Sequence, residues 1–267
     1  MIENLSVEEL IKRDRVVLLL ALAGITVLSW LYLIHLDRSM AGTMDMAGMA
    51  GMSMPMIGEW RDTDFFLTFV MWSVMMVGMM LPSAAPMLLT FATVTRRRAQ
   101  RGGPYIPTGI FLAGYLTVWT LFSFVATLAE WRLHAAALLN MQTQIIAPRL
   151  AAGALVAAGI FQFAPFKNTC LSHCRSPLDF LTTEWREGWS GAVRMGLKHG
   201  AFCVGCCWML MVLLFVAGVM NLLWVAAIAA FVLVEKMFPR GRLVSWMGGA
   251  VCLLAGLVWL LHIPRAR

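Results

Sequence analysis

The stretch HGAFCVGCCW, residues 199–208, places one histidine and three cysteines within nine positions of an otherwise apolar segment. In a helix, which advances about 100° per residue, His199, Cys203, Cys206 and Cys207 share one face about 100° wide. A lone buried cysteine is usually only a small apolar side chain, but thiolates and imidazole together are ligands for Cu(I) or Zn(II). We expect this face to bind a metal; close packing is the alternative.

Three further donors lie upstream, in the stretch KNTCLSHCR at residues 167–175. In a short helix, Cys170, His173 and Cys174 fall on a single face. The spacing C-x-x-H-C is too short to form a complete zinc module by itself. We therefore expect these side chains to contact a metal at the inner end of the same site, near His199. The alternative is a reduced loop that binds nothing.

Methionines follow helical spacing in the stretch FVMWSVMMVGMMLPSAAPM, residues 69–87. At about 100° per residue, one stripe holds Met71, Met75 and Met79, and Met76 and Met80 form another beside it. Thioethers are soft ligands for Cu(I), but methionine is also a common filler of helix interfaces. Metal transfer and core packing both remain open for these stripes.

A second methionine-rich segment, MAGTMDMAGMAGMSMPM, spans residues 40–56, and seven of its seventeen residues are methionine. Its glycine content makes it a poor core element, and thioethers bind Cu(I) without losing a proton. We expect this segment to capture metal; a low-complexity linker or a loop resting on the membrane is the alternative. The methionines are Met40, Met44, Met46, Met49, Met52, Met54 and Met56.

The elements that position these residues are long apolar runs. Of the 267 residues, 60% are hydrophobic and 13% are charged, and each run is long enough for the roughly 30 Å core of a bilayer. We predict an all-α, polytopic transmembrane helical bundle with a cytoplasmic amphipathic helix at 1–15 and a single transmembrane domain at 16–267. The outer loop is expected at 36–62 and the inner loop, with an interfacial helix, at 167–197. The seven expected spans are 16–35, 63–91, 107–129, 149–166, 198–218, 221–236 and 243–261.

Charge predicts the orientation of the bundle. With the N-terminus in the cytoplasm and the C-terminus outside, fifteen of the 21 lysines and arginines fall on the inner side, as expected for a bacterial inner-membrane protein. The net charge of +7 therefore does not indicate nucleic-acid binding. None of the six cysteines lies in an expected outer loop, so a disulfide framework is not expected.

One acidic residue belongs with the candidate site residues. Glu235 ends the sixth expected span, next to Lys236. Carboxylates inside a membrane are functional candidates, but Glu235 lies near the interface, where pairing with Lys236 or Arg242 is an equal alternative. Cys252, in the seventh span, is expected to serve packing.

These motifs together resemble a family of bacterial inner-membrane proteins of unknown function, described as predicted metal-binding integral membrane proteins. The matching motifs read MWSVMMVGMMLPSAAPM at 71–87, LSHCRSP at 171–177, HGAFCVGCCWMLM at 199–211 and EK at 235–236. The resemblance covers about residues 60–240 and excludes the methionine-rich segment at 40–56. It implies metal binding, which adds weight to the cysteines and His199, but it specifies neither the metal nor transport.

The preferred hypothesis is Cu(I) handling, with transport or delivery to a metal-carrying protein of the periplasm or cytoplasm; Zn(II) or haem is less favoured. No G-x-x-x-x-G-K-[ST] motif occurs, so transport would not use a nucleotide bound in that way. A thiol–disulfide oxidoreductase that uses Cys203 and Cys206 is one rival, although a helix gives such a pair poor disulfide geometry. An assembly factor that holds a metal or haem without moving it is another.

Overall fold

The computed structural model describes residues 7–49, 60–140 and 143–262. This part of the chain is built of helices, with one isolated β-bridge between Leu139 and Ile145. The all-α class is therefore confirmed. In chain order the helices are α1 (Val7–Met49), α2 (Asp62–Gln100), α3 (Thr108–Ala135), α4 (Pro148–Phe163), α5 (Pro165–Arg175), α6 (Pro177–Glu184), α7 (Gly188–Ala217), α8 (Leu222–Met237) and α9 (Gly241–His262).

Each of the seven expected spans overlaps a helix, but the fourth, 149–166, crosses the break between α4 and α5, and not every helix is long enough to cross a membrane. Within the described ranges, five helices are long and apolar enough by themselves, namely α2, α3, α7, α9 and the Lys12–Ser39 part of α1. The pair α4 and α5, bent by 64°, raises the number to six if it forms one span. Helix α8 has 16 residues, or about 24 Å, which is shorter than a typical hydrocarbon core.

Helix α1 differs from the expected arrangement. It runs without interruption over 43 residues, so the described part of the N-terminal segment continues into the first long helix. The same helix extends through Met40, Met44, Met46 and Met49, where a loop was expected. Methionine and alanine are strong helix formers, and they outweigh the two glycines of this stretch, Gly42 and Gly48.

The inner connection is also shorter than expected, because α7 begins at Gly188 rather than near residue 198. What remains between α4 and α7 is two short helices, α5 and α6. Both begin with proline at the first helical position, where its fixed φ favours a helix start. Within the range 167–197, where an interfacial helix was expected, α6 ends at Glu184.

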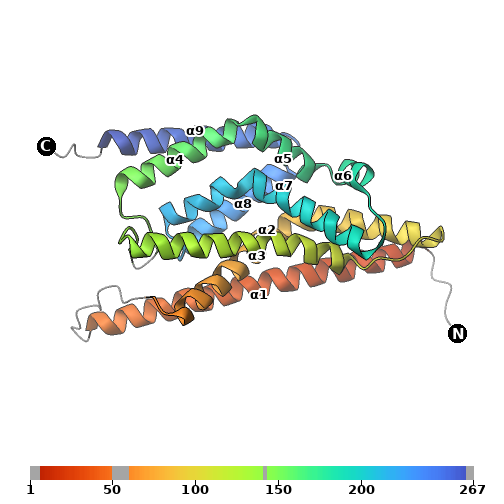
Figure 1. The fold of residues 1–267 in the computed structure, drawn as a ribbon, viewed down its shortest axis with the longest axis horizontal. Coiled ribbons are helices and arrows are strands. Elements are labelled where there is room, and N and C mark those ends of the chain that lie inside the picture. Colours follow the sequence, from red (N-terminus) through yellow and green to blue (C-terminus); the bar gives the residue numbers. More distant parts are fainter. Residues whose placement is uncertain (1–6, 50–59, 141–142, 263–267) are drawn as a thin grey trace.

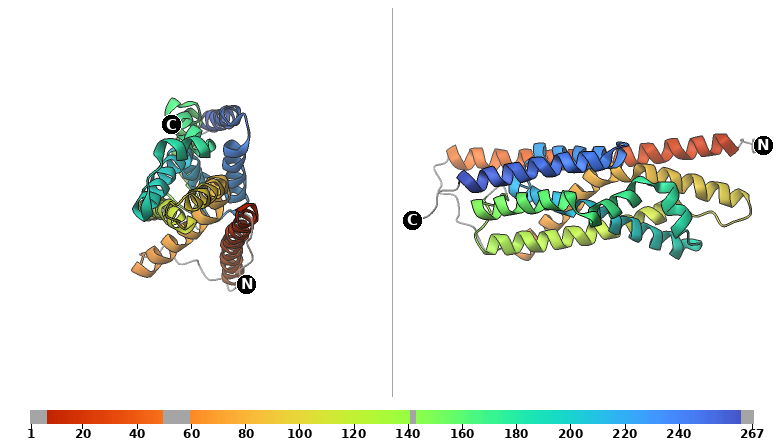
Figure 2. Two further views of the ribbon diagram at one scale, coloured as in Figure 1. Left: turned by 90° about the vertical axis from the view of Figure 1, so that its right-hand side faces the viewer. Right: turned by 90° about the horizontal axis from the view of Figure 1, so that it is seen from above.

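The helices pack as an elongated bundle in which α1 lies along α2, α3 lies along α7, and α4 lies along α9 (Figures 1 and 2). Glycines permit the closest approaches. A Cβ atom on Gly196 of α7 would collide with the backbone carbonyl of Phe111 on α3, and one on Gly114 would collide with that of Val193. Small residues bring membrane helices together in the same manner.

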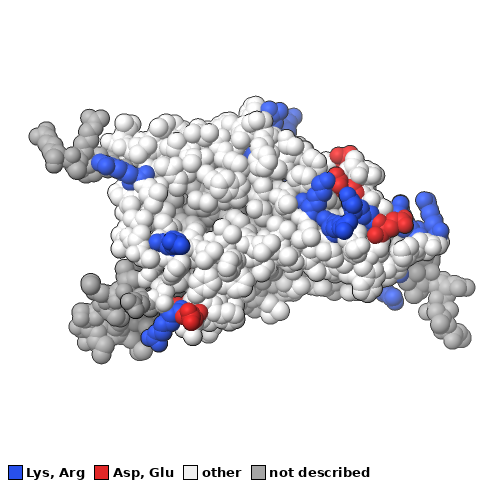
Figure 3. All heavy atoms as spheres, viewed as in Figure 1, with Lys and Arg blue, Asp and Glu red and all other residues white. Residues whose placement is uncertain are grey.

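Charged side chains are concentrated toward the ends of the bundle. On the face drawn in Figure 3, most lysine, arginine, aspartate and glutamate atoms lie toward the two ends, a few lysine or arginine atoms lie at the upper edge near the middle, and most of the surface between is uncharged. Large apolar side chains are exposed along α1 and α9, among them Leu20, Leu28, Leu254 and Leu261. An apolar belt of this kind suits a lipid environment.

Candidate metal-binding site

Four buried thiols gather where α5 meets α7. Cys203, Cys206 and Cys207 of α7 are each 1% exposed or less. The thiol of Cys174 on α5 is buried as well and interacts with the thiols of Cys203 and Cys206. The four sulfur atoms therefore come from two helices that are separate in sequence.

The turn between α4 and α5 makes this meeting possible. Pro165 starts α5 at 64° to α4, which lays the α5 cysteines against α7. Gly205 of α7 leaves the space for Cys170, whose Sγ atom lies only 3.0 Å from where a Cβ would stand. All six cysteines, Cys252 included, are free thiols.

Side chains of α3 and α8 contact the sulfur of Cys203 on α7, and both side chains also bond to α2. Lys236 of α8 donates a hydrogen bond to Cys203 Sγ at 2.9 Å and another to Ser83 Oγ of α2 at 3.1 Å. The hydroxyl of Tyr115 on α3 lies 3.1 Å from the same sulfur and donates to the carbonyl oxygen of Met80 at 3.3 Å. This hydroxyl links the methionine-bearing helix α2 directly to the thiols.

The methionine stripes of α2 face the interior of the bundle. Met71, Met75, Met76, Met79 and Met80 are all buried, as either packing or metal transfer requires. Three more buried methionines were not singled out in the sequence, and they lie on α2 and α7: Met87, Met195 and Met211. The helical spacing of Met211 from Cys207, four residues, was the available signal.

His199 is enclosed by aromatic rings next to the thiols. Its ring centroid lies 5.7 Å from that of Tyr115 and 5.5 Å from that of Phe180, and it interacts electrostatically with Cys203 and Cys206. Its Nδ1 atom is buried without a hydrogen-bond partner. An unpaired buried nitrogen is costly, and a free imidazole nitrogen is a ligand for soft and borderline metals.

The structure does not bring His173 to the thiols. Its ring stacks on Phe202 with centroids 4.2 Å apart, and its Nδ1 lies 2.8 Å from the carbonyl oxygen of Thr169. Cys170 and Cys174 on the same helix are buried, whereas His173 is only partly buried. The expected grouping of all three on one metal-facing side is therefore only partly realised.

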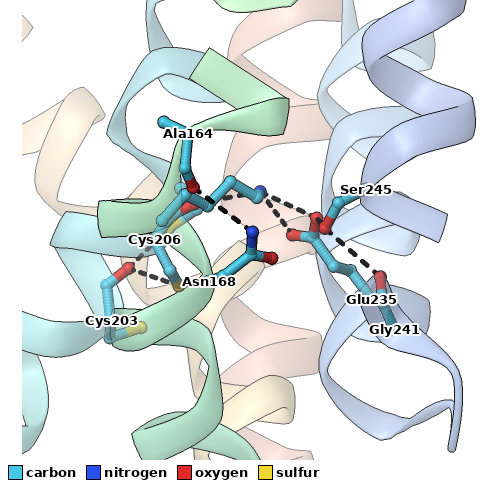
Figure 4. A network of polar contacts seen from close by, with 9 residues as sticks. Ala164, Asn168, Cys203, Cys206, Glu235, Gly241 and Ser245 are labelled. Carbon is cyan, nitrogen blue, oxygen red and sulfur yellow. Dashed lines mark hydrogen bonds and ion pairs between the residues drawn. The ribbon is translucent and has the colours of Figure 1, made fainter. Parts of the chain in front are cut away.

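A buried ion pair lies next to the thiol cluster, close to Cys206 (Figure 4). Lys167 Nζ lies 2.7 Å from Glu235 Oε1, with both side chains fully buried, and it also donates to the carbonyl oxygen of Cys206 at 3.0 Å. The hydroxyl of Ser245 on α9 donates to the same carboxylate. These bonds join α5, α7, α8 and α9.

This pairing corrects the expected partner of Glu235. The sequence suggested Lys236 or Arg242, but consecutive helix residues point in directions about 100° apart. Glu235 therefore faces Lys167, and Lys236 faces Cys203. Lys167 was assigned to an inner loop, and nothing in its local sequence signals its burial.

A second buried carboxylate was also missed. Glu130 of α3 accepts a hydrogen bond of 2.6 Å from the indole nitrogen of Trp72, next to Met71 on α2. The ring of Trp72 in turn packs on Phe215 of α7 at 5.2 Å. This contact ties α2, α3 and α7 together at the opposite end of the methionine stripes from Met80.

The candidate ligands are soft donors, but in the described ranges they do not form a complete coordination sphere. Across the described ranges, no three histidine, cysteine, aspartate or glutamate side chains are arranged as a ready metal site. The thiols of Cys206 and Cys207 donate to the carbonyl oxygen of Cys203 at 3.1 and 2.9 Å. Thiols and thioethers are ligands that suit Cu(I), whereas a structural zinc site needs four ligands in a tetrahedron.

The structure describes only part of the methionine-rich segment at 40–56, which the sequence predicts to capture metal. Met44 and Met46 belong to the final turns of α1, as does Met49 at its end, and their side chains are not described. Met52 and Met54 lie outside the described residues, together with Met56.

Comparison with known proteins agrees with the chemistry of this site. The model of a family described as "PpoB2: Copper chaperone" matches residues 69–259. The match covers well over half of the chain and includes the methionine stripes of α2, the cysteines of α5 and the thiols of α7. No curated protein and no solved structure matches the chain. The chain belongs to the PpoB2 copper chaperone family.

Proposed function

We propose that this protein binds Cu(I) inside a membrane and passes it between carriers through the thiols of α5 and α7. The observation that carries the proposal is the convergence of Cys174, Cys203, Cys206 and Cys207 in the buried interior, joined through Tyr115 to the methionine-bearing helix. Membership of a copper chaperone family supports copper as the cargo.

The chemistry of the donors favours the monovalent ion. Thiolates and thioethers are soft ligands that select Cu(I) among biological metals. Neutral thioethers bind it loosely enough for release, while thiolates cancel its charge in a medium of low dielectric constant. We therefore place the resting position of the ion at Cys203 and Cys206, with Cys207 as a structural neighbour.

The route runs along the bundle. Methionines of the segment at 40–56 gather Cu(I) outside, the stripes of α2 pass it inward, and Cys203 with Cys206 hold it. His199, Cys170 and Cys174 then receive it at the inner end. In this arrangement the chain is a multi-pass protein of the bacterial inner membrane, with the N-terminus inside, and it exchanges copper with a periplasmic or cytoplasmic carrier.

Elemental analysis of the purified protein tests the site. After reconstitution with Cu(I) under reducing conditions, the wild type should retain copper, and a variant with Cys203, Cys206 and Cys207 replaced by serine should lose it. Cys252→Ser is the matched control, because Cys252 lies on α9 outside the cluster. Equal copper content in the triple variant and the wild type would exclude the thiols as the site.

Transfer requires a separate measurement. Sealed vesicles that contain the wild type should accumulate copper from a Cu(I) donor on one side faster than vesicles with the triple variant. A protein that binds copper stoichiometrically but gives no uptake is a holder, and the transport part of the proposal would then be withdrawn.

A further inference from the structure

Lys236 is a buried cation in direct contact with the thiol cluster. Its side chain is nearly inaccessible, with the residue 7% exposed, and its ammonium group donates to Cys203 Sγ at 2.9 Å. A second hydrogen bond, to Ser83 Oγ at 3.1 Å, anchors the ammonium group to α2. The same group interacts electrostatically with Cys206 and Cys174.

Within the part of the chain that the structure describes, Lys236 forms no ion pair with a carboxylate. The adjacent Glu235 is paired with Lys167 and hydrogen-bonded to Ser245 on another side of α8. The other ion pairs found in the described ranges are at least partly exposed and involve neither Lys236 nor Glu235. A buried ammonium group without a partner is expensive in a medium of low dielectric constant. Of the two hydrogen-bond partners of Lys236 in the described ranges, the Ser83 hydroxyl stays neutral, so the thiol of Cys203 is the one that can become negative, by losing its proton.

We infer that Lys236 is a specificity-determining residue, the counter-charge of a two-cysteine Cu(I) site. This inference rests on the proposed function. When Cu(I) binds to two cysteines, two S–H bonds break, two S–Cu bonds form, and two protons leave for the solvent. Two thiolates and one monovalent ion carry a net charge of −1, and Lys236 brings the total to zero.

The same sum of charges disfavours a divalent ion at Cys203 and Cys206. Two thiolates and Zn(II) are already neutral, so the ammonium group would leave an uncompensated positive charge next to the ion. Such a charge is costly in a buried site. Lys236 thus selects the charge of the cargo, in addition to the selection by soft sulfur ligands.

Substitutions that remove only the charge test the inference. Lys236→Met keeps the length and apolar stem, and Lys236→Gln also keeps a group that hydrogen-bonds to Ser83. Lys236→Arg retains the charge, and Lys198→Met removes a lysine that is paired with Glu184 at the surface. The full-length variants are purified in detergent, and helicity and elution volume confirm the fold.

The readout is the ratio of two affinities for each variant. Cu(I) affinity is measured by competition with bicinchoninate, and Zn(II) affinity by competition with a chromophoric zinc chelator. Loss of one partner of a buried charge pair predicts that the Met and Gln variants lose about 10- to 100-fold in the Cu(I)-to-Zn(II) ratio. The Arg variant and Lys198→Met should keep the ratio of the wild type. A substitution that merely distorts the site lowers the Cu(I) and Zn(II) affinities alike. A change in their ratio therefore reports the effect of the charge.

The outcomes separate this inference from the proposed function. A wild type that does not bind Cu(I) overturns both. A wild type that binds Cu(I), together with neutral variants of unchanged ratio, overturns the role of Lys236 alone. A loss of ratio in the Arg variant as large as in the Met variant also overturns it, because the charge is then not the cause.

Discussion

The buried pair Lys167–Glu235 should be the most sensitive polar contact of the bundle. Both side chains are fully inaccessible, and the nitrogen–oxygen distance is 2.7 Å, so solvent does not screen the pair. Removing one partner of a buried ion pair costs about 3–5 kcal/mol, because the other charge is left uncompensated, whereas replacing both with apolar residues is often nearly neutral. Lys167→Met and Glu235→Leu should therefore each destabilise the protein by about this amount, and the double variant by much less.

Thermal unfolding in detergent, followed by helical circular dichroism, measures this difference. At about 2–4 °C per kcal/mol for a chain of this size, each single variant should unfold about 6–20 °C below the wild type, and the double variant within a few degrees of it. Lys198→Met, at a surface pair with Glu184, should shift the midpoint by about 2–4 °C at most.

The result also bears on the thiols. Lys167 donates to the carbonyl oxygen of Cys206 and so holds α5 against α7. We expect copper binding to weaken in Lys167→Met even under conditions where the variant remains helical. The reasoning is refuted if the double variant is as unstable as the sum of the two single variants, because the two charges are then not coupled.

Three further outcomes follow from the packing and from the proposed copper route. Gly196→Ala would drive a Cβ atom into the Phe111 carbonyl and should sharply lower the yield of folded protein on size exclusion, while Gly24→Ala, with open space around it, should leave the yield unchanged. His199→Phe should preserve the aromatic packing and thermal stability but slow copper release to a Cu(I) chelator or acceptor protein; release at the wild-type rate would exclude His199 from the transfer step. Deletion of residues 40–56 should reduce copper accumulation by cells under scarcity and leave Cu(I) affinity at the thiols unchanged, and equal accumulation would count against capture by this segment.

Helical periodicity was sufficient to predict which side chains of α7 are buried together. Cys203, Cys206, Cys207 and His199 share one face by spacing alone, and the structure buries all four. The same argument predicted the inward methionine stripes of α2, because a single helix determines the relative directions of its own side chains. The all-α class followed from the long apolar runs.

Only the tertiary structure decided which side chains of one helix face which side chains of another. Periodicity placed His173 with Cys170 and Cys174, but in the folded bundle its ring stacks on Phe202 of α7. Glu235 and Lys236 are neighbours in sequence, yet they meet Lys167 and Cys203, which are 68 and 33 residues away. Hydrogen bonds and ion pairs between helices depend on rotation and depth, and neither quantity is encoded in the local pattern of a single segment. The sequence by itself therefore determined which side chains could bind a metal, and only the folded bundle decided which charged side chains lie next to them.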